Sequence, residues 1–226
     1  AYDVRGAGNS TRPTQKSAYD LKLLVDDLAA VVDAVSPKKA VHLVAHDWGS
    51  IQSWEAVTTP TLQGRIASYT TISGPSLDHA GHWIRQRLSS GSPKQLAQLA
   101  RQAAHSWYIA MFHLPLVAPT IWRLAGDKFW PTVLEKAEGI KDAAINPTQA
   151  SDGKIGVNLY RANILNRVLR PQQRHATIPV QLIVPTGDNF MVQEIWDDLA
   201  QWTSKLWRRE VNSGHWIQVS HPQLVA

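Results

Sequence analysis

The residues of this chain that could do chemistry centre on Asp47, in the segment Val44-Ala45-His46-Asp47-Trp48-Gly49-Ser50. An apolar run leads into this segment and a helical pattern follows it, which predicts a sharp turn from strand to helix. Small residues stand two positions before and two after Asp47. That pattern is typical of a nucleophile on a strained turn, pointing above a sheet near a positive helix end. A carboxylate there can attack an electrophilic carbon, with the Trp48 backbone N–H as an oxyanion donor. The alternative is that Asp47 only caps the following helix.

A carboxylate nucleophile forms an ester, and breaking that ester requires a histidine that activates water and an acid that orients the histidine. His215, which follows the last strand-like segment, is the predicted base. On sheets with this kind of turn the acid stands between nucleophile and histidine in the chain. Asp188, in the turn after the apolar run at 180–184, is therefore the predicted acid. Because Asn189 is adjacent, the register stays open, and Asp78 is the alternative acid.

The elements that must position these residues alternate between helical and strand-like patterns. Apolar residues recur at helical spacing from 18 to 35, and the short apolar run at 41–45 predicts a strand buried on both faces. The other expected core elements are a helix at 50–57, strands at 66–73, 180–184 and 208–211, and a helix at 192–205. This alternation predicts an α/β fold, a mostly parallel sheet with helices on both faces.

The alternation is interrupted between residues 75 and 175, where the chain is rich in Trp, Ala and Gln, helical in pattern and punctuated by prolines. An all-helical insert between two α/β portions predicts a cap on a sheet-based core. We therefore divide the chain into a first core part at 1–74, a helical cap at 75–175 and a second core part at 176–226.

Composition excludes several other classes of protein. The chain has 226 residues, 44% hydrophobic and 18% charged, which is too apolar for a disordered chain. Its lack of cysteine excludes disulfide scaffolds, thiolate metal sites and a cysteine nucleophile. The net charge is +5, but the basic residues are scattered and form no nucleic-acid motif, so we expect no nucleic-acid partner. No apolar run approaches the roughly 18 residues that would predict a membrane span.

Three motifs together resemble the epoxide hydrolase and haloalkane dehalogenase branch of the α/β hydrolases. The segment Asp3-Val4-Arg5-Gly6-Ala7-Gly8-Asn9-Ser10 is similar to a loop of these enzymes. His46-Asp47-Trp48-Gly49 is similar to their nucleophile motif, and Gly214-His215-Trp216 to their histidine motif. The resemblance covers nearly the whole chain. It implies the α/β hydrolase fold with an inserted helical cap, and chemistry that uses no cofactor and no metal.

The cap distinguishes the two kinds of enzyme in this branch. For an epoxide hydrolase of this branch, the resemblance implies that two tyrosines of the cap protonate the oxygen of the opening epoxide. Tyr108 and Tyr160 stand in stretches, 106–115 and 158–161, that resemble the two tyrosine motifs, with His113 in place of the usual Gln. A phenol suits this task because it donates a hydrogen bond while neutral at pH 7. A haloalkane dehalogenase that holds halide with Trp48 and a second Trp or Asn is one alternative, and a non-catalytic binding domain is another.

The leading expectation is a cytoplasmic epoxide hydrolase that opens a small hydrophobic epoxide to a diol through an Asp47 ester. The family's His-Gly-x-Pro loop and the strands before it are missing, and the chain stops where the last core helix is expected, so we expect a fragment of a longer protein. Related domains occur fused to other enzymes, including short-chain dehydrogenases, which allows a second activity in the parent protein. With an open sheet edge and one oxyanion donor missing, the isolated chain is expected to be poorly stable. The oligomeric state stays open.

Overall fold

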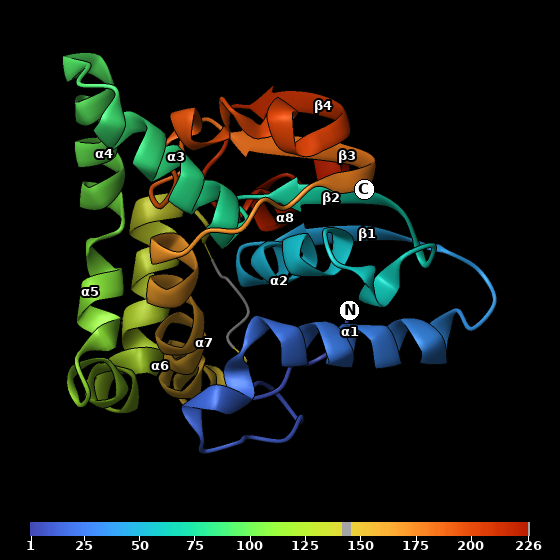
Figure 1. Ribbon diagram of the computed structural model, residues 1–226. Helices are drawn as coiled ribbons and strands as arrows, with labels where there is room; N and C mark the ends of the chain where they lie inside the picture. Colours follow the sequence, from blue (N-terminus) through green and yellow to red (C-terminus); the bar gives the residue numbers. More distant parts are fainter. Residues whose placement is uncertain (142–145, 226) are drawn as a thin grey trace.

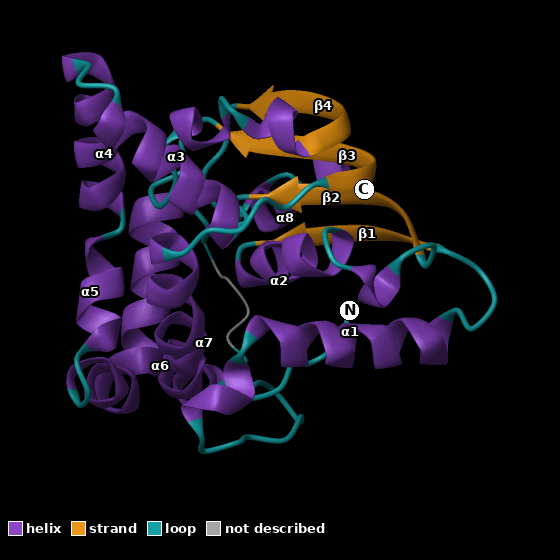
Figure 2. Ribbon diagram, viewed as in Figure 1, coloured by secondary structure: helices purple, strands orange, loops and turns teal. Residues whose placement is uncertain are grey.

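A parallel sheet forms the centre of the computed structural model, which describes residues 1–141 and 146–225. In this part of the chain its strands lie in the order β1 (Val41–His46), β2 (Ile66–Ile72), β3 (Ala176–Pro185) and β4 (Thr203–Val211) (Figure 1, Figure 2). The register pairs His46 with Ile72, Ile72 with Ile183, and Pro185 with Val211. The carboxyl ends of the strands therefore meet at one edge, where ligands bind in open α/β sheets.

Helices cover both faces of this sheet, which confirms the predicted α/β architecture. On one face, Trp54 of α2 packs against Leu182 of β3. On the other face, Ile217 of α8 packs against Ile183. Because successive side chains of a strand point to opposite faces, the neighbours Leu182 and Ile183 belong to two different core clusters. The core helices are α1 (Leu21–Val35), α2 (Trp48–Val57), α8 (Ile217–Ser220) and α9 (Pro222–Val225), with the short 3₁₀ helices η1 (Lys16–Tyr19) and η2 (Pro60–Leu62).

The prediction that the strand at 41–45 is buried on both faces is wrong. In β1 the side chains of Leu43 and Ala45 are partly buried against the core, whereas His42 and Val44 are exposed. Val44 keeps 53% of its surface accessible. In the described residues β1 is an edge strand that pairs only with β2. The apolar run is typical of a central strand, whose two faces are both covered, and the sequence does not reveal the alternation of exposure.

The predicted helix at 192–205 is also wrong. Two 3₁₀ helices, η3 (Gln193–Trp196) and η4 (Leu199–Trp202), occupy that segment, and β4 begins at Thr203 instead of 208. Within the two 3₁₀ helices the buried side chains are Trp196, Leu199 and Trp202, which are spaced three apart. This spacing suits a 3₁₀ helix, in which residues i and i+3 lie on one side, and it mimics an α-helical pattern in the sequence.

Among the described residues between β2 and β3 there are five helices, and α4 to α7 stack beside the sheet (Figure 1). We propose that they form the cap, with the boundaries predicted above. α3 packs on α7 so closely that a side chain on Gly81 would lie 2.7 Å from the carbonyl oxygen of Val168. The five are α3 (Leu77–Ser89), α4 (Pro93–His105), α5 (Trp107–His113), α6 (Val117–Glu138) and α7 (Gln149–Leu169).

No helix within residues 1–141 and 146–225 is both long and apolar enough to cross a membrane. The same described residues contain no cluster of three or more His, Asp or Glu side chains that could hold a metal ion.

Candidate active site

Asp47 sits on a strained turn between β1 and α2. Its backbone has φ 51° and ψ −124°, and its N–H donates to the Ile72 carbonyl oxygen at 3.0 Å. A residue other than glycine in such a region costs about 1–3 kcal/mol and persists only where neighbours hold it. The Asp47 side chain is 41% exposed. Trp48 opens α2, so its backbone N–H belongs to the first turn, whose amides have no partner within the helix. A plain helix cap needs no such strain, and the Asp47 side chain makes no capping hydrogen bond.

The sequence prediction missed what holds this turn. A Cβ on Gly74, just after β2, would lie 2.1 Å from the Asp47 carbonyl oxygen, so only glycine allows the two segments to approach. Beneath the turn, buried Ser50 Oγ donates to the Gly74 carbonyl oxygen at 2.6 Å and lies 2.7 Å from the Tyr69 hydroxyl. At Gly49, by contrast, a Cβ would make only ordinary contact with Ala45 at 3.9 Å. The position where only glycine fits is therefore Gly74, which is distant from Asp47 in the chain.

Asp188 and His215 form a buried hydrogen-bonded pair. His215 Nδ1 lies 3.0 Å from both carboxylate oxygens of Asp188, and the two side chains are 4% and 2% exposed for His215 and Asp188. Oδ1 of Asp188 also accepts from the backbone N–H groups of Phe190 and Met191, at 2.7 and 3.1 Å. Burial opposes ionisation of Asp188, but these hydrogen bonds and the His215 charge lower the pKa of its carboxyl below the ordinary value.

The other ring nitrogen of His215 faces Asp47, with 3.8 Å between Nε2 and Oδ1. Burial disfavours the imidazolium, yet the hydrogen bond to Asp188 and the charges of Asp188 and Asp47 raise the pKa of His215 above its ordinary value. Glu138, at the end of α6, adds to this effect and accepts from the backbone N–H of Trp216 at 3.4 Å. The arrangement provides a base whose protonated form is stabilised, directly beside the exposed carboxylate.

Asp78, the alternative acid, lies elsewhere in the structure. It is buried at the start of α3, where Oδ1 accepts from the backbone N–H of Gln172 at 2.8 Å. Its other oxygen lies 3.5 Å from the guanidinium groups of both Arg167 and Arg174. These contacts tie α3 to the end of α7. Of the two predicted acids, only Asp188 is beside His215.

Tyr108 of α5 and Tyr160 of α7 meet above Asp47. Their ring centroids are 6.0 Å apart, and Trp48 packs edge-on against Tyr160 at 4.8 Å. Burial, the largest cause, and the charge of Asp47 raise the pKa of both phenols above the ordinary value. The structure thus brings together Asp47, Trp48, His215 and both tyrosines, with both phenols in the neutral, hydrogen-donating form.

Polar side chains on α7 hold the two tyrosines in place. Asn163, which is 1% exposed, accepts from the Leu21 backbone N–H at 2.9 Å and donates to the Tyr19 carbonyl oxygen at 2.8 Å, so α7 is tied to the start of α1. Arg161 donates to the carbonyl oxygens of Phe112 and Leu114, at 2.6 Å each. These bonds fix the end of α5, the helix that carries Tyr108. The sequence prediction did not find either role.

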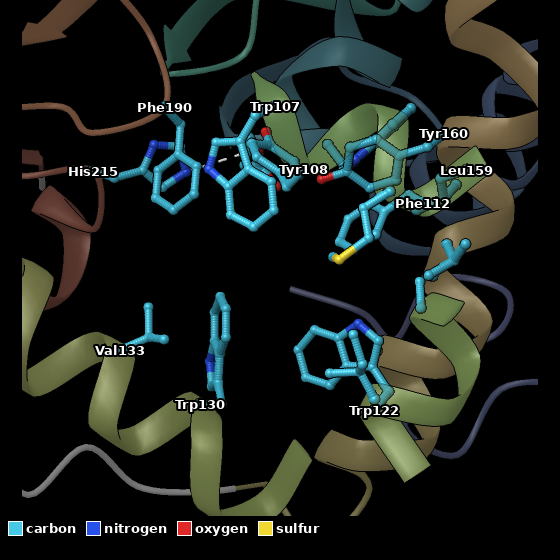
Figure 3. Close-up of a pocket in the computed structure, with 18 of the residues that line it drawn as sticks. Trp107, Tyr108, Phe112, Trp122, Trp130, Val133, Leu159, Tyr160, Phe190 and His215 are labelled. Carbon is cyan, nitrogen blue, oxygen red and sulfur yellow. Dashed lines mark ion pairs between the residues drawn. The ribbon is translucent and has the colours of Figure 1, made fainter. Parts of the chain in front are cut away.

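One cavity of about 640 Å³ connects these groups. Figure 3 shows His215, Phe190, Tyr108 and Tyr160 on one side of the space, and Trp122 and Trp130 of α6 on the opposite side. The cavity wall is mostly aromatic or aliphatic, which is typical of sites for apolar small molecules. Besides the residues already named, the wall includes Trp48, Trp107, Met111, Phe112, Ile121, Val133, Val157, Leu159 and Trp216.

A parallel sheet with an exposed carboxylate on a strained turn, a histidine paired with an acid at the strand ends, and helices over them is typical of the α/β hydrolase class. The family model for the alpha/beta hydrolase fold matches residues 1–222, and the chain belongs to this family. This confirms the predicted fold and the resemblance seen in the motifs.

Two named proteins and one solved structure are similar to this chain. The chain is 34% identical over its full length to "Probable oxidoreductase EphD" of Mycobacterium tuberculosis, of which it covers 39%. It is 34% identical over 128 residues to "Epoxide hydrolase A" of the same species, with 56% of the chain and 35% of that protein covered. The chain thus spans well under half the length of these relatives. A solved Bacillus megaterium epoxide hydrolase in complex with an inhibitor shares the fold, with a TM-score of 0.73, 20% identity, and coverage of 99% of this chain and 79% of that one. The chain is an epoxide hydrolase-like α/β hydrolase.

Proposed function

We propose that this chain hydrolyses an apolar epoxide to a diol through an ester on Asp47. The observation that carries the proposal is that an exposed carboxylate, two neutral phenols and the histidine of a buried histidine–acid pair all border one apolar cavity. The reaction needs only water besides the epoxide, which agrees with the expectation that no cofactor takes part. Relatives named as epoxide hydrolases support the same reaction.

In the first step an Asp47 oxygen attacks one epoxide carbon. A carbon–oxygen bond of the ring breaks, and its electron pair moves to the ring oxygen. Tyr108 and Tyr160 donate hydrogen bonds to that oxygen and supply its proton, since their phenols are neutral in this site. The product of this step is a hydroxyalkyl ester of Asp47.

In the second step His215 takes a proton from water, and the resulting hydroxide attacks the ester carbonyl carbon. The backbone N–H of Trp48 stabilises the oxyanion, and Asp188 stabilises the imidazolium. Collapse of the intermediate breaks the acyl carbon–oxygen bond. The leaving alkoxide takes the proton from the His215 imidazolium, which completes the diol. The carboxylic acid proton of Asp47 returns to the tyrosine that gave up its proton in the first step, and the Asp47 carboxylate keeps one oxygen from water.

The two other candidate functions receive less support. A haloalkane dehalogenase does not require the paired phenols over the nucleophile. A non-catalytic binding domain does not require Asp188 within 3.0 Å of His215. Release of halide from haloalkanes without diol formation from epoxides would favour the dehalogenase.

Single turnover in ¹⁸O-labelled water tests the proposal, with enzyme in excess over a lipophilic epoxide. Mass analysis of the peptide that contains Asp47 is expected to show one ¹⁸O atom, because the ester route places the water oxygen in the carboxylate. Label found only in the diol would contradict the proposal. Asp47→Asn serves as the control and is expected to show no turnover.

A further inference from the structure

The cavity extends well beyond the atoms that the reaction uses. Opposite Tyr160 and His215 it is closed by Trp122 and Trp130 of α6 (Figure 3). A water molecule occupies about 30 Å³, so 640 Å³ holds on the order of twenty water-sized groups. An epoxide ring fills only a small part of this space, so the remaining volume must receive the rest of the substrate.

Three glycines line the cavity, one on α6 and two on α7, and two of the three have a clear packing reason. A Cβ on Gly153 of α7 would lie 2.3 Å from the Trp122 ring, and one on Gly126 of α6 would lie 3.0 Å from it. The Trp122 indole therefore rests directly on the backbone at these two positions, where any side chain would displace it.

Gly156, the third glycine, has no such neighbour. A Cβ there would have no atom within 4 Å beyond its chain neighbours and the backbone of its own helix, although the residue lines the cavity on α7 together with Gly153, Val157 and Tyr160. These positions share one face of the helix, since residues three or four apart lie together. Gly156 stands one turn before Tyr160, a rise of about 6 Å along the axis. Its missing side chain keeps open the space beside the phenol.

We propose that Gly156 sets the size limit of the substrate, by leaving a channel along α7 for a long, uncharged apolar arm that extends from the epoxide carbon. This inference rests on the proposed function and adds to it a substrate class, epoxides with an extended neutral alkyl or aryl substituent. On this wall the described lining side chains near Gly156 are apolar, among them Trp122 and Val157. A charged end group there would lose its hydration without a partner.

The test compares 1,2-epoxydecane with 1,2-epoxybutane in Gly156→Leu. A leucine there projects into the channel, and it also suits a helix better than glycine, so the variant is expected to fold. We expect kcat/KM for epoxydecane to fall at least about tenfold, since even one methylene changes specificity by that much. For epoxybutane we expect a change within about twofold, because its short arm ends before the obstruction. Gly156→Ala is expected to lie between.

Lys154→Leu is the matched control, because it places the same side chain on an exposed position of the same helix. It is expected to leave the ratio of the two kcat/KM values unchanged. An unchanged ratio in Gly156→Leu, or an equal loss for both epoxides, would overturn the proposal.

Binding separates this inference from the proposed reaction. Quenching of the cavity tryptophan fluorescence by decane-1,2-diol and butane-1,2-diol reports affinity without chemistry. If Gly156→Leu weakens the binding of decane-1,2-diol but not of butane-1,2-diol, the result supports the channel. This holds even if neither epoxide reacts, and in that case only the proposed function fails. Unchanged diol affinities would contradict the channel itself.

Discussion

Replacing Asp188 by asparagine removes the charge that faces His215 while keeping the shape of the side chain. Both groups are almost fully buried, with 3.0 Å between nitrogen and oxygen, so solvent screens the pair little. Two unit charges about 4 Å apart interact by about 4 kcal/mol at an effective dielectric constant near 20. A loss of about 1.4 kcal/mol slows a reaction tenfold, so ester hydrolysis in Asp188→Asn should slow by about 10³-fold.

The same substitution should also move the pH dependence of ester hydrolysis. The base acts in its neutral form, so the rate falls as pH falls through the pKa of His215, which Asp188 holds above its ordinary value. Without that charge the imidazolium is less stable, the pKa of His215 falls, and the acid limb of the rate profile moves to lower pH.

Rapid quench followed by intact-protein mass spectrometry measures both steps, because formation of the ester precedes hydrolysis. Asp188→Asn is expected to accumulate the ester in a burst, with the slow rate in the second phase. The control is Asp78→Asn, which should leave the acid limb in place. A rate within tenfold of the parent protein in Asp188→Asn, or a shifted limb in Asp78→Asn, would refute the assigned pair.

Four substitutions test other parts of the structure. Tyr160→Phe and Tyr108→Phe should each slow ester formation by about 10²-fold, because each removes a phenol that protonates the epoxide oxygen. The rate of ester hydrolysis, measured by stopped flow, should stay unchanged. Slower hydrolysis with unchanged ester formation would argue against the role of the tyrosines as acids. Gly74→Ala should destabilise the fold by at least about 2 kcal/mol in urea unfolding, because its Cβ would overlap the Asp47 carbonyl oxygen, and unchanged stability would show that the turn relaxes freely. Asp78→Asn should cost about 1–3 kcal/mol by thermal unfolding, since it removes a buried carboxylate that faces two arginines, and a neutral result would argue against these ion pairs. The cost stays at this level because Glu55 still pairs with both arginines.

The local sequence around Asp47, Asp188 and His215 was sufficient to predict the strand-end geometry. Each follows the carboxyl end of a strand within a few residues, and the parallel register brings these strand ends to one edge. Tyr108 and Tyr160 could be proposed only through the resemblance. Their helices show no local signal that both phenols point at one carboxylate.

Contacts between segments that are distant in the chain could not be predicted from the sequence. Gly74 matters because β2 ends beside the turn after β1, which no pattern near residue 74 reveals. Asn163 looks like an ordinary polar residue on a helix and Asp78 like a second candidate acid, and only the packed structure shows the partners that each contacts. The predicted helix at 192–205 is two 3₁₀ helices, because their buried residues at 196, 199 and 202 follow a period of three, which is close to the period of 3.6 of an α-helix.

The boundaries of the cap, the cytoplasmic location, and fusion to a further enzyme domain stay predictions. The first concerns the division of the chain into domains, the second the place of the protein in the cell, and the third the rest of the parent protein.

The central claim is that Asp47 becomes covalently bound to the substrate and that His215 releases it. His215→Gln keeps a polar side chain at the site but removes the base, so the ester should form and then persist. Intact-protein mass spectrometry after incubation with 1,2-epoxydecane should show one added substrate mass, located on the Asp47 peptide and absent from the variant that also carries Asp47→Asn. An unmodified protein that still forms diol would contradict the account.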